Sequence, residues 1–178
     1  MTRTLQTQQT KLTSLYHQRE QQLHHPQTRP HGNTYYPPIL FIKHKPTTPP
    51  YGHNPLLTGL LQTLNLTPKD CYYTHLPQHP YQGPTTPQKT LKQTKQNLKL
   101  LLPEIQLIDP QIIILLGPEP SRTFNPNTPY ENKLGTIEIK HNYTITTTYD
   151  LDTIKGNPQL ICATNKHYTQ LKPLILKE

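Results

Sequence analysis

The chain has 178 residues, which is enough for one domain with its own hydrophobic core. Only 31% of the residues are hydrophobic and 21 are proline, so the composition lies close to that of chains that do not fold. The net charge of +8 excludes a strongly acidic protein and favours a polyanionic partner, because Lys and Arg placed against phosphates release condensed counterions. Nucleic acid is the expected partner, and a basic surface that serves only solubility is the alternative.

Long apolar segments and cysteine clusters are both missing from the sequence. No run approaches the roughly 20 apolar residues that cross a bilayer, and the first turns of the chain lack the apolar core of a secretory signal. We therefore expect a soluble intracellular protein with no membrane insertion. Cys71 and Cys162 are too few for a disulfide framework or an iron–sulfur cluster, so no cofactor and no metal site is expected.

The amino-acid usage also carries a signature of the gene. Val is absent, Ala occurs once, and Thr, Pro, Gln, His and Lys are plentiful, which indicates a coding strand poor in guanine and rich in A and C. Such strand asymmetry is typical of small replicons, so we expect a mitochondrial or other organellar genome, or a viral one. Without Val, the β-strands must be built from Ile, Leu, Thr and Tyr.

The first segment, residues 1–34, is rich in Thr, Gln and His and is predicted to be an N-terminal extension to a folded domain over 35–178. Apolar residues recur at helical spacing over 10–23. The inward positions of this helix are Leu12, Leu15, Tyr16, Arg19 and Leu23. Because so polar an extension has little surface of its own to bury, we expect it to become ordered by contacting another protein subunit.

Beyond the extension, predicted strands and helices alternate. The strands are 39–44, 71–76, 111–117, 136–141 and 143–150, and the helices are 54–66, 90–108 and 163–175. This alternation predicts an α/β fold, with three α/β/α layers around a central, mainly parallel four-stranded sheet. The four central strands are 39–44, 71–76, 111–117 and 143–149. The segment QIIILLG at 111–117 is apolar throughout, which is typical of a central strand buried on both sides.

The helix over 90–108 is amphipathic. Its inward stripe is predicted to be Leu91, Leu98, Leu102 and Ile105. A row of lysines falls largely on the other side and is interpreted as a solvated face rather than a binding site. These lysines are Lys89, Lys92, Lys95 and Lys99.

Three segments at the junctions of these elements carry a pattern: LLQTLNLTPKDCYYTHL, LIDPQIIILLG and TYDLDTIKGNP. Their order and wording resemble the uracil-DNA glycosylase superfamily, particularly its family-four members, from about Ile39 to the end of the chain. The first is similar to a helix, acidic turn and strand that closes on Tyr-Ile-Thr-Asn in the family. The last is similar to Thr-Tyr-His-Pro followed by Leu-Leu-Arg-Asn-Pro. The resemblance implies a site at the carboxyl edge of the sheet, where such enzymes bind a flipped base.

The resemblance also implies which positions hold the reaction residues, and each of them departs from the family pattern. KHKPT at 43–47 aligns with Gly-Glu-Ala-Pro-Gly, which puts the water-positioning acid on His44. The base-reading Asn falls on His75, and the final His falls on Asp150. An imidazole cannot offer the paired donor and acceptor of an amide, and an ionised Asp150 opposes the developing negative charge of uracil. One cluster-cysteine position is occupied by His79. We therefore expect that catalysis has been lost.

Several residues near the same edge are expected to contact nucleic acid. The expected phosphate ligands are Lys43, Lys45, Arg122 and Lys155. Tyr51, beside Gly52 in the loop before the helix at 54–66, is the expected stacking aromatic.

Three functions fit these features. The first is a noncatalytic nucleic-acid-binding protein on a glycosylase-like scaffold, serving as a structural or accessory subunit. The second is a subunit of a large ribonucleoprotein such as an organellar ribosome, in which the core is a packing unit. The third is an active, diverged uracil-DNA glycosylase with His44 and Asp150 in altered roles. The sequence favours the two noncatalytic functions and leaves DNA and RNA both open as the ligand.

Overall fold

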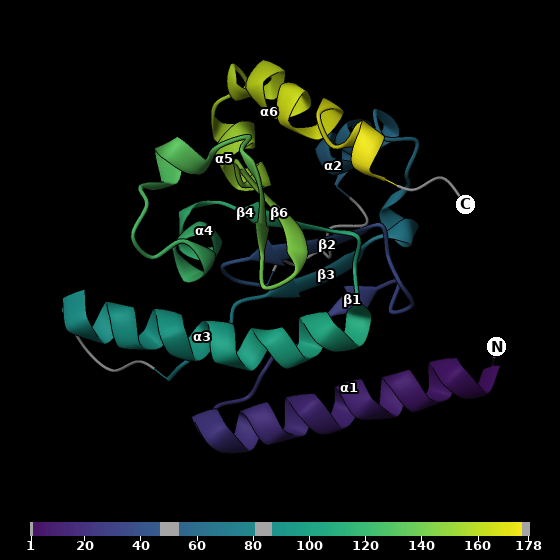
Figure 1. The fold of residues 1–178 in the computed structure, drawn as a ribbon, viewed down its shortest axis with the longest axis vertical. Coiled ribbons are helices and arrows are strands. Elements are labelled where there is room, and N and C mark those ends of the chain that lie inside the picture. The colour runs from purple at the N-terminus through teal and green to yellow at the C-terminus, as the bar shows by residue number, and fades with distance from the viewer. Residues whose placement is uncertain (1, 47–53, 81–86, 176–178) are drawn as a thin grey trace.

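The computed structural model describes residues 2–46, 54–80 and 87–175. Its centre is a six-stranded mixed sheet with the strand order β1-β3-β2-β4-β6-β5 (Figure 1). The strands are β1 His31–Gly32, β2 Ile39–Lys43, β3 Tyr72–His75, β4 Ile112–Leu116, β5 Ile137–Lys140 and β6 Tyr143–Thr148. The protein is therefore α/β as predicted, but the sheet has six strands where four were predicted.

The four strands predicted for the centre of the sheet are neighbours, and each pairs with the next in parallel, in the order β3, β2, β4, β6. Strand β4 pairs with β2 on one side and β6 on the other, and all its residues are buried, which confirms the central place predicted for QIIILLG. The added strands are antiparallel. β5 forms a hairpin with β6, and β1 pairs with β3. The two-residue β1 was not predicted because His31 and Gly32 carry no hydrophobic pattern.

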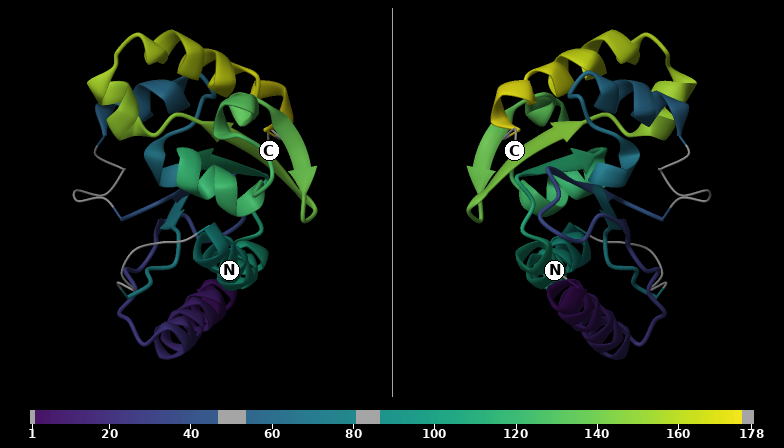
Figure 2. Two further views of the ribbon diagram at one scale, coloured as in Figure 1. Left: turned by 90° about the vertical axis from the view of Figure 1, so that its left-hand side faces the viewer. Right: turned by 90° about the vertical axis from the view of Figure 1, so that its right-hand side faces the viewer.

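Helices cover both faces of the sheet (Figure 1, Figure 2). The helices are α1 Thr2–Leu23, α2 Pro55–Gln62, α3 Pro87–Ile108, α4 Pro118–Phe124, α5 Leu151–Gly156 and α6 Leu160–Thr169, with short 3-10 turns η2 Pro68–Asp70, η3 Tyr130–Lys133 and η4 Lys172–Leu174. Alternate residues of β2 point to opposite faces: Phe41 joins the core under α2, α5 and α6, while Ile42 joins the core under α1, α3 and α4.

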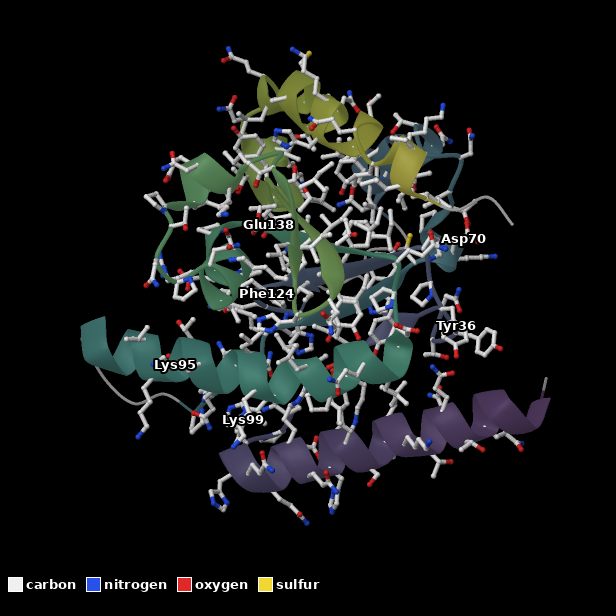
Figure 3. All side chains as sticks on the ribbon, in the orientation of Figure 1. Tyr36, Asp70, Lys95, Lys99, Phe124 and Glu138 are labelled. Carbon is white, nitrogen blue, oxygen red and sulfur yellow. The ribbon has the colours of Figure 1, made fainter. Side chains whose placement is uncertain are left out.

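Helix α3 turns a different stripe inward from the predicted one. Leu91 is 44% exposed and Leu98 and Leu102 are only half-buried; of the predicted stripe only Ile105 is fully buried. Over residues 91–108 the buried residues of the helix are Thr94, Asn97, Leu101, Glu104, Ile105 and Ile108. Half of them are polar, so a stripe drawn through apolar residues alone misses the true face. On the opposite side Lys92, Lys95 and Lys99 are exposed as predicted; Figure 3 labels Lys95 and Lys99 along α3.

Helix α1 packs along α3 (Figure 1). Four of its five predicted inward residues are buried, namely Leu12, Tyr16, Arg19 and Leu23. The Gln8 side chain adds a hydrogen bond by donating to the Leu107 carbonyl oxygen at 2.7 Å. The N-terminal segment is thus ordered against the chain's own domain, and its contact with another subunit stays a prediction.

A carboxylate at the centre of this packing holds three elements together. Glu104 of α3 is fully buried, and its oxygens accept hydrogen bonds from Tyr16 at 3.0 and 3.1 Å, Tyr72 at 3.0 Å and Arg19 at 2.9 Å. Burial alone would lower the pKa of Arg19, but the charge and hydrogen bonds of Glu104 and Tyr16 together outweigh burial, and the pKa is raised. Arg19 therefore stays charged, and α1, α3 and β3 meet at one buried ion pair.

Removal of the Glu104 carboxylate should be strongly destabilising. In Glu104→Ala the Arg19 guanidinium stays buried without its anion, which costs about 3–5 kcal/mol of unfolding free energy. Chemical denaturation followed by circular dichroism measures the loss. The double variant Arg19→Met/Glu104→Leu removes both charges and should recover most of it.

The matched control is Glu119→Ala, because Glu119 is 41% exposed in its 2.9 Å ion pair with Arg122. Loss of an exposed pair should cost no more than about 1 kcal/mol. Equal losses in Glu104→Ala and Glu119→Ala would contradict the role assigned to the buried pair.

Candidate functional site

The topology of the sheet marks one place for a ligand site. From β2 the chain goes to β3 on one side, and from β3 it crosses to β4 on the other side of β2. Open α/β sheets bind ligands beyond the carboxyl ends of the strands at such a switch point. The loops that meet there begin after Lys43 of β2 and at Gly117 after β4. Tyr51, the predicted stacking residue, lies outside the described residues.

Lys43 is the central charge at this edge. It is 5% exposed, and its ammonium lies 2.6 Å from an Asp152 oxygen and 3.4 Å from an Asp150 oxygen. A buried ammonium is stable only when its charge is compensated, and these two carboxylates provide the compensation. Lys43 was predicted to contact phosphate; it must leave this pairing before it can do so.

Asp150 is the N-cap of α5. Its backbone is extended, with φ −69° and ψ 144°, and its side chain accepts a hydrogen bond from the Asp152 N–H at 3.4 Å. This confirms the prediction that Asp150 braces the loop after β6. Gly117 lies beside it with φ +88°, so the end of β4 approaches Asp150 in a conformation that favours glycine. Burial raises the pKa of Asp150, and the Lys43 ammonium opposes that rise.

The two histidines at the other family positions lie in different surroundings. His44 is exposed directly after β2, and partial desolvation lowers its pKa while Glu119 opposes the shift. His75 ends β3, is 6% exposed, and burial lowers its pKa to about 4. Because β2 and β4 lie between β3 and β6, His75 and Asp150 are separated by roughly 14 Å at the usual strand spacing. The three positions share one edge of the sheet without forming one contact group.

A hollow of about 450 Å³ opens beside this edge, after α4. Its lining includes Arg122, Asn127, Tyr130 and Glu131. The Tyr130 hydroxyl donates to the carbonyl oxygen of Thr148 at 3.3 Å, two residues before Asp150, so the hollow borders the end of β6. Burial, and then the neighbouring Tyr149 and Asp150, raise the pKa of Tyr130, so its hydroxyl stays protonated. A guanidinium, an amide and an aromatic ring meet here, and these groups suit phosphate, base edges and base faces.

The other predicted contact residues surround the hollow and the edge. Arg122 lines the hollow and is paired with Glu119 at 2.9 Å. Lys45, two residues after β2, and Lys155, in the last turn of α5, are exposed and have no ion-pair partner in the part of the chain that the structure describes. The structure therefore brings Lys43, Asp150 and Asp152 into contact and leaves the remaining cations at the rim.

Sequence reasoning missed Asp152 and Tyr130. Asp152 had a partial signal, because Asp-Leu-Asp follows β6 at the same edge of the sheet as Lys43, although β4 lies between β6 and β2. Tyr130 had none, since the turn around it is irregular and its hydrogen bond joins residues 18 positions apart.

No protein-family model matches the chain, and no curated protein matches it. Within residues 2–46, 54–80 and 87–175, no three His, Cys, Asp or Glu side chains are grouped so as to hold a metal ion. The helices described for these ranges include none with the length and apolar character needed to span a bilayer. The likeness to uracil-DNA glycosylases thus stays a hypothesis that depends on the three sequence segments.

The burial of His75 predicts a loss of stability at mildly acidic pH. In the unfolded chain the imidazole takes up a proton near its ordinary pKa of 6.5, whereas the folded protein keeps it neutral down to about pH 4. The unfolded state then binds more protons, so the free energy of unfolding falls as the pH drops from 6.5 to about 4. Above that window the contribution of His75 is fully present.

Denaturant unfolding at a series of pH values measures the slope. His75→Gln should show a shallower decline across the window than the parent, whatever its absolute stability. His17→Gln, on the exposed side of α1, makes the same substitution outside the core and is the matched control. Identical slopes for the parent and His75→Gln would refute the assignment.

Proposed function

We propose that this protein binds nucleic acid on a uracil-DNA glycosylase-like scaffold that has lost catalysis, and that it acts as a structural or accessory subunit of a DNA- or RNA-containing complex. An organellar ribosome is one such complex. The observation that carries the proposal is the charge at the carboxyl edge of the sheet, where Asp150, Asp152 and Glu119 are paired with cations and the exposed Lys45 and Lys155 have no ion-pair partner in the described residues.

The pairing can be followed residue by residue. Asp150 and Asp152 are bound to Lys43, and Glu119 is bound to Arg122. Glu131 on the rim of the hollow is the exposed exception. The exposed Lys45 and Lys155 place two positive charges on the solvent-facing surface around the same edge.

Helix α3 adds to the same charge. It follows β3 along the chain and returns across the sheet, so its first turns lie on the side where the parallel strands end. Lys92 and Lys95, which the sequence pattern alone assigned to a solvated face, are exposed on those turns and have no ion-pair partner in the described ranges, so the proposal includes them in the binding surface. The resulting rim of ammonium groups suits a phosphate backbone, and it agrees in sign with the net charge of +8.

The hollow beside the edge fits an unpaired base. Its volume of about 450 Å³ falls in the range of small-ligand pockets. Tyr130 offers a ring for stacking and Asn127 an amide for a base edge. Bases inside a duplex cannot reach such a pocket without leaving the stack, so single strands and loops are the favoured ligands.

The arrangement of the family positions supports the loss of catalysis. His44 is exposed, His75 is buried and neutral at neutral pH, and Asp150 is engaged with Lys43 and the start of α5. A glycosylase needs an acid to position water, an amide to read uracil and a donor for the departing anion. These residue types do not stand at those positions.

One observation favours an active glycosylase as the second candidate. Burial raises the pKa of Asp150, and the Lys43 ammonium lies 3.4 Å from its carboxylate. A protonated acid or an ammonium at this place would stabilise the negative charge that develops on uracil.

The first test of the proposal is the salt dependence of binding to single-stranded DNA and RNA, measured by fluorescence anisotropy. The affinity should fall steeply with salt, and Lys155→Glu should weaken binding to all sequences alike and reduce the log–log slope by about 1. Lys69→Glu makes the same charge change at η2, before β3 and therefore at the opposite edge of the sheet. It should bind more tightly than Lys155→Glu. Binding that is flat with salt, or equally weak in both variants, would count against the proposal.

The second test measures uracil release. No release from uracil-containing single- or double-stranded DNA is expected at neutral pH, because the donor and amide positions hold Asp150 and His75. Multiple-turnover release that disappears in Asp150→Ala would establish the enzyme instead. Asp150→Asn keeps an N-cap oxygen and should therefore leave the folded structure and nucleic-acid binding intact.

A further inference from the structure

The β5–β6 hairpin presents a strand edge that pairs with no other strand in the described part of the chain. β5 is the last strand in the sheet order and pairs with β6. Figure 2 shows the hairpin at the outer margin of the molecule. Edge strands of monomeric proteins usually carry charges that block pairing with other chains. Here the outward residues are Ile139, which is 79% exposed, and Ile137, which is 39% exposed.

The turn of the hairpin decides which backbone groups face outward. His141 and Asn142 form a two-residue turn, both with left-handed backbones at φ 51° and 70°, and Lys140 lies opposite Tyr143. The closing pair of such a hairpin is hydrogen-bonded, so the N–H and C=O of Lys140, and by alternation those of Glu138, point toward β6. The backbone groups of Ile137 and Ile139 consequently point away from β6, toward the edge.

The charged side chains of β5 face the protein. The Glu138 carboxylate lies 2.7 Å from the ammonium of Lys133 and 3.9 Å from that of Lys140. Lys140 donates to the carbonyl oxygen of Phe124 at 3.1 Å, and Figure 3 labels Glu138 and Phe124 on this side of the molecule. The hairpin therefore directs its charges inward and its isoleucines outward, the reverse of the usual order.

We propose that β5 pairs with β5 of a second copy of this chain, antiparallel about a twofold axis at Ile139, so that two sheets join into one. In this register Ile139 lies opposite the partner's Ile139, and the outward backbone groups of both are used. Glu138 then lies opposite the partner's Lys140, and Lys140 opposite the partner's Glu138. These are close, non-hydrogen-bonded positions, where opposite charges stabilise a strand pair.

Charge complementarity selects this register over its neighbours. A twofold axis at Glu138 would place two glutamates opposite each other, which is destabilising. An axis at Ile137 would place Ile139 opposite the partner's Gly135, whose N–H already donates to the carbonyl oxygen of Thr147 at 2.8 Å. The proposal is independent of nucleic-acid binding, since it uses neither the hollow nor the carboxyl edge.

Sedimentation velocity of the full chain over a concentration series tests the dimer. The mass should rise from one chain to two, and Ile139→Lys, which brings two ammonium groups together at the axis, should raise the dissociation constant about tenfold or more. Leu174→Lys places the same change on an exposed apolar residue of η4, where it is 40% exposed, and should leave the dimer intact. A chain that stays monomeric throughout the series overturns the proposal, as does equal dimerisation of the two variants.

Charge complementation tests the register. Glu138→Lys alone and Lys140→Glu alone each set like charges opposite each other and should dissociate, whereas an equimolar mixture of the two should form a heterodimer. Failure of the mixture to associate, with both variants folded by circular dichroism, refutes the Ile139 register.

If either variant does not fold, Ile139→Cys in a Cys162→Ser background decides the question. Paired Cα atoms at the axis would lie about 5.5 Å apart, within disulfide range, so oxidation should link two chains, and a monomeric product overturns the proposal.

Discussion

The buried ion pair of Arg19 and Glu104 fixes how the layers of this protein meet. Glu104 enters the core from α3 and accepts from α1 through Arg19 and Tyr16, and from β3 through Tyr72. A chain with 31% hydrophobic residues has little apolar surface with which to pack α1 against α3. The hydrogen bonds and the ion pair of Glu104 therefore fix how α1, α3 and β3 are placed, which apolar packing alone would not determine. They also hold β3 from the α3 side, through Tyr72 and through Thr74, whose hydroxyl lies 3.2 Å from that of Tyr16.

The carboxyl edge of the sheet depends on that framework. β3 is held by its contacts with α1 and α3. β2 ends between β3 and β4, and from there Lys43 reaches the start of α5. Its ammonium lies beside both Asp152 and Asp150 and offsets one of their two negative charges. The proposed interface thus owes its positive sign to the exposed lysines at its rim, while pairing with Lys43 offsets part of the charge of Asp150 and Asp152.

The sequence predicted the strands well because Ile, Leu, Tyr and Thr form short uninterrupted runs between turn residues. It predicted the inward face of α1, where Arg19 stands at an apolar position, but not the face of α3. The predicted face of α3 was drawn through apolar residues alone, so it left out Glu104. The partners of Glu104 lie up to 88 positions away in the chain and could not be recognised from local spacing. The edge could be located from the ends of the strands. The pairing of Lys43 with Asp152 could not, since 109 positions separate them and no periodicity links them.

The β5–β6 hairpin has a kinetic consequence. Every other strand pair of the described sheet joins segments that are far apart in sequence, such as Ile39 with Ile112, whereas the hairpin closes over two residues. Hairpins form in roughly microseconds, long before such distant segments meet. The edge with Ile139 is therefore present while the rest of the chain is still open. Glu138 and Lys140 on the same short strand then limit aggregation, because a pairing of newly made chains centred on Glu138 or on Lys140 brings like charges together.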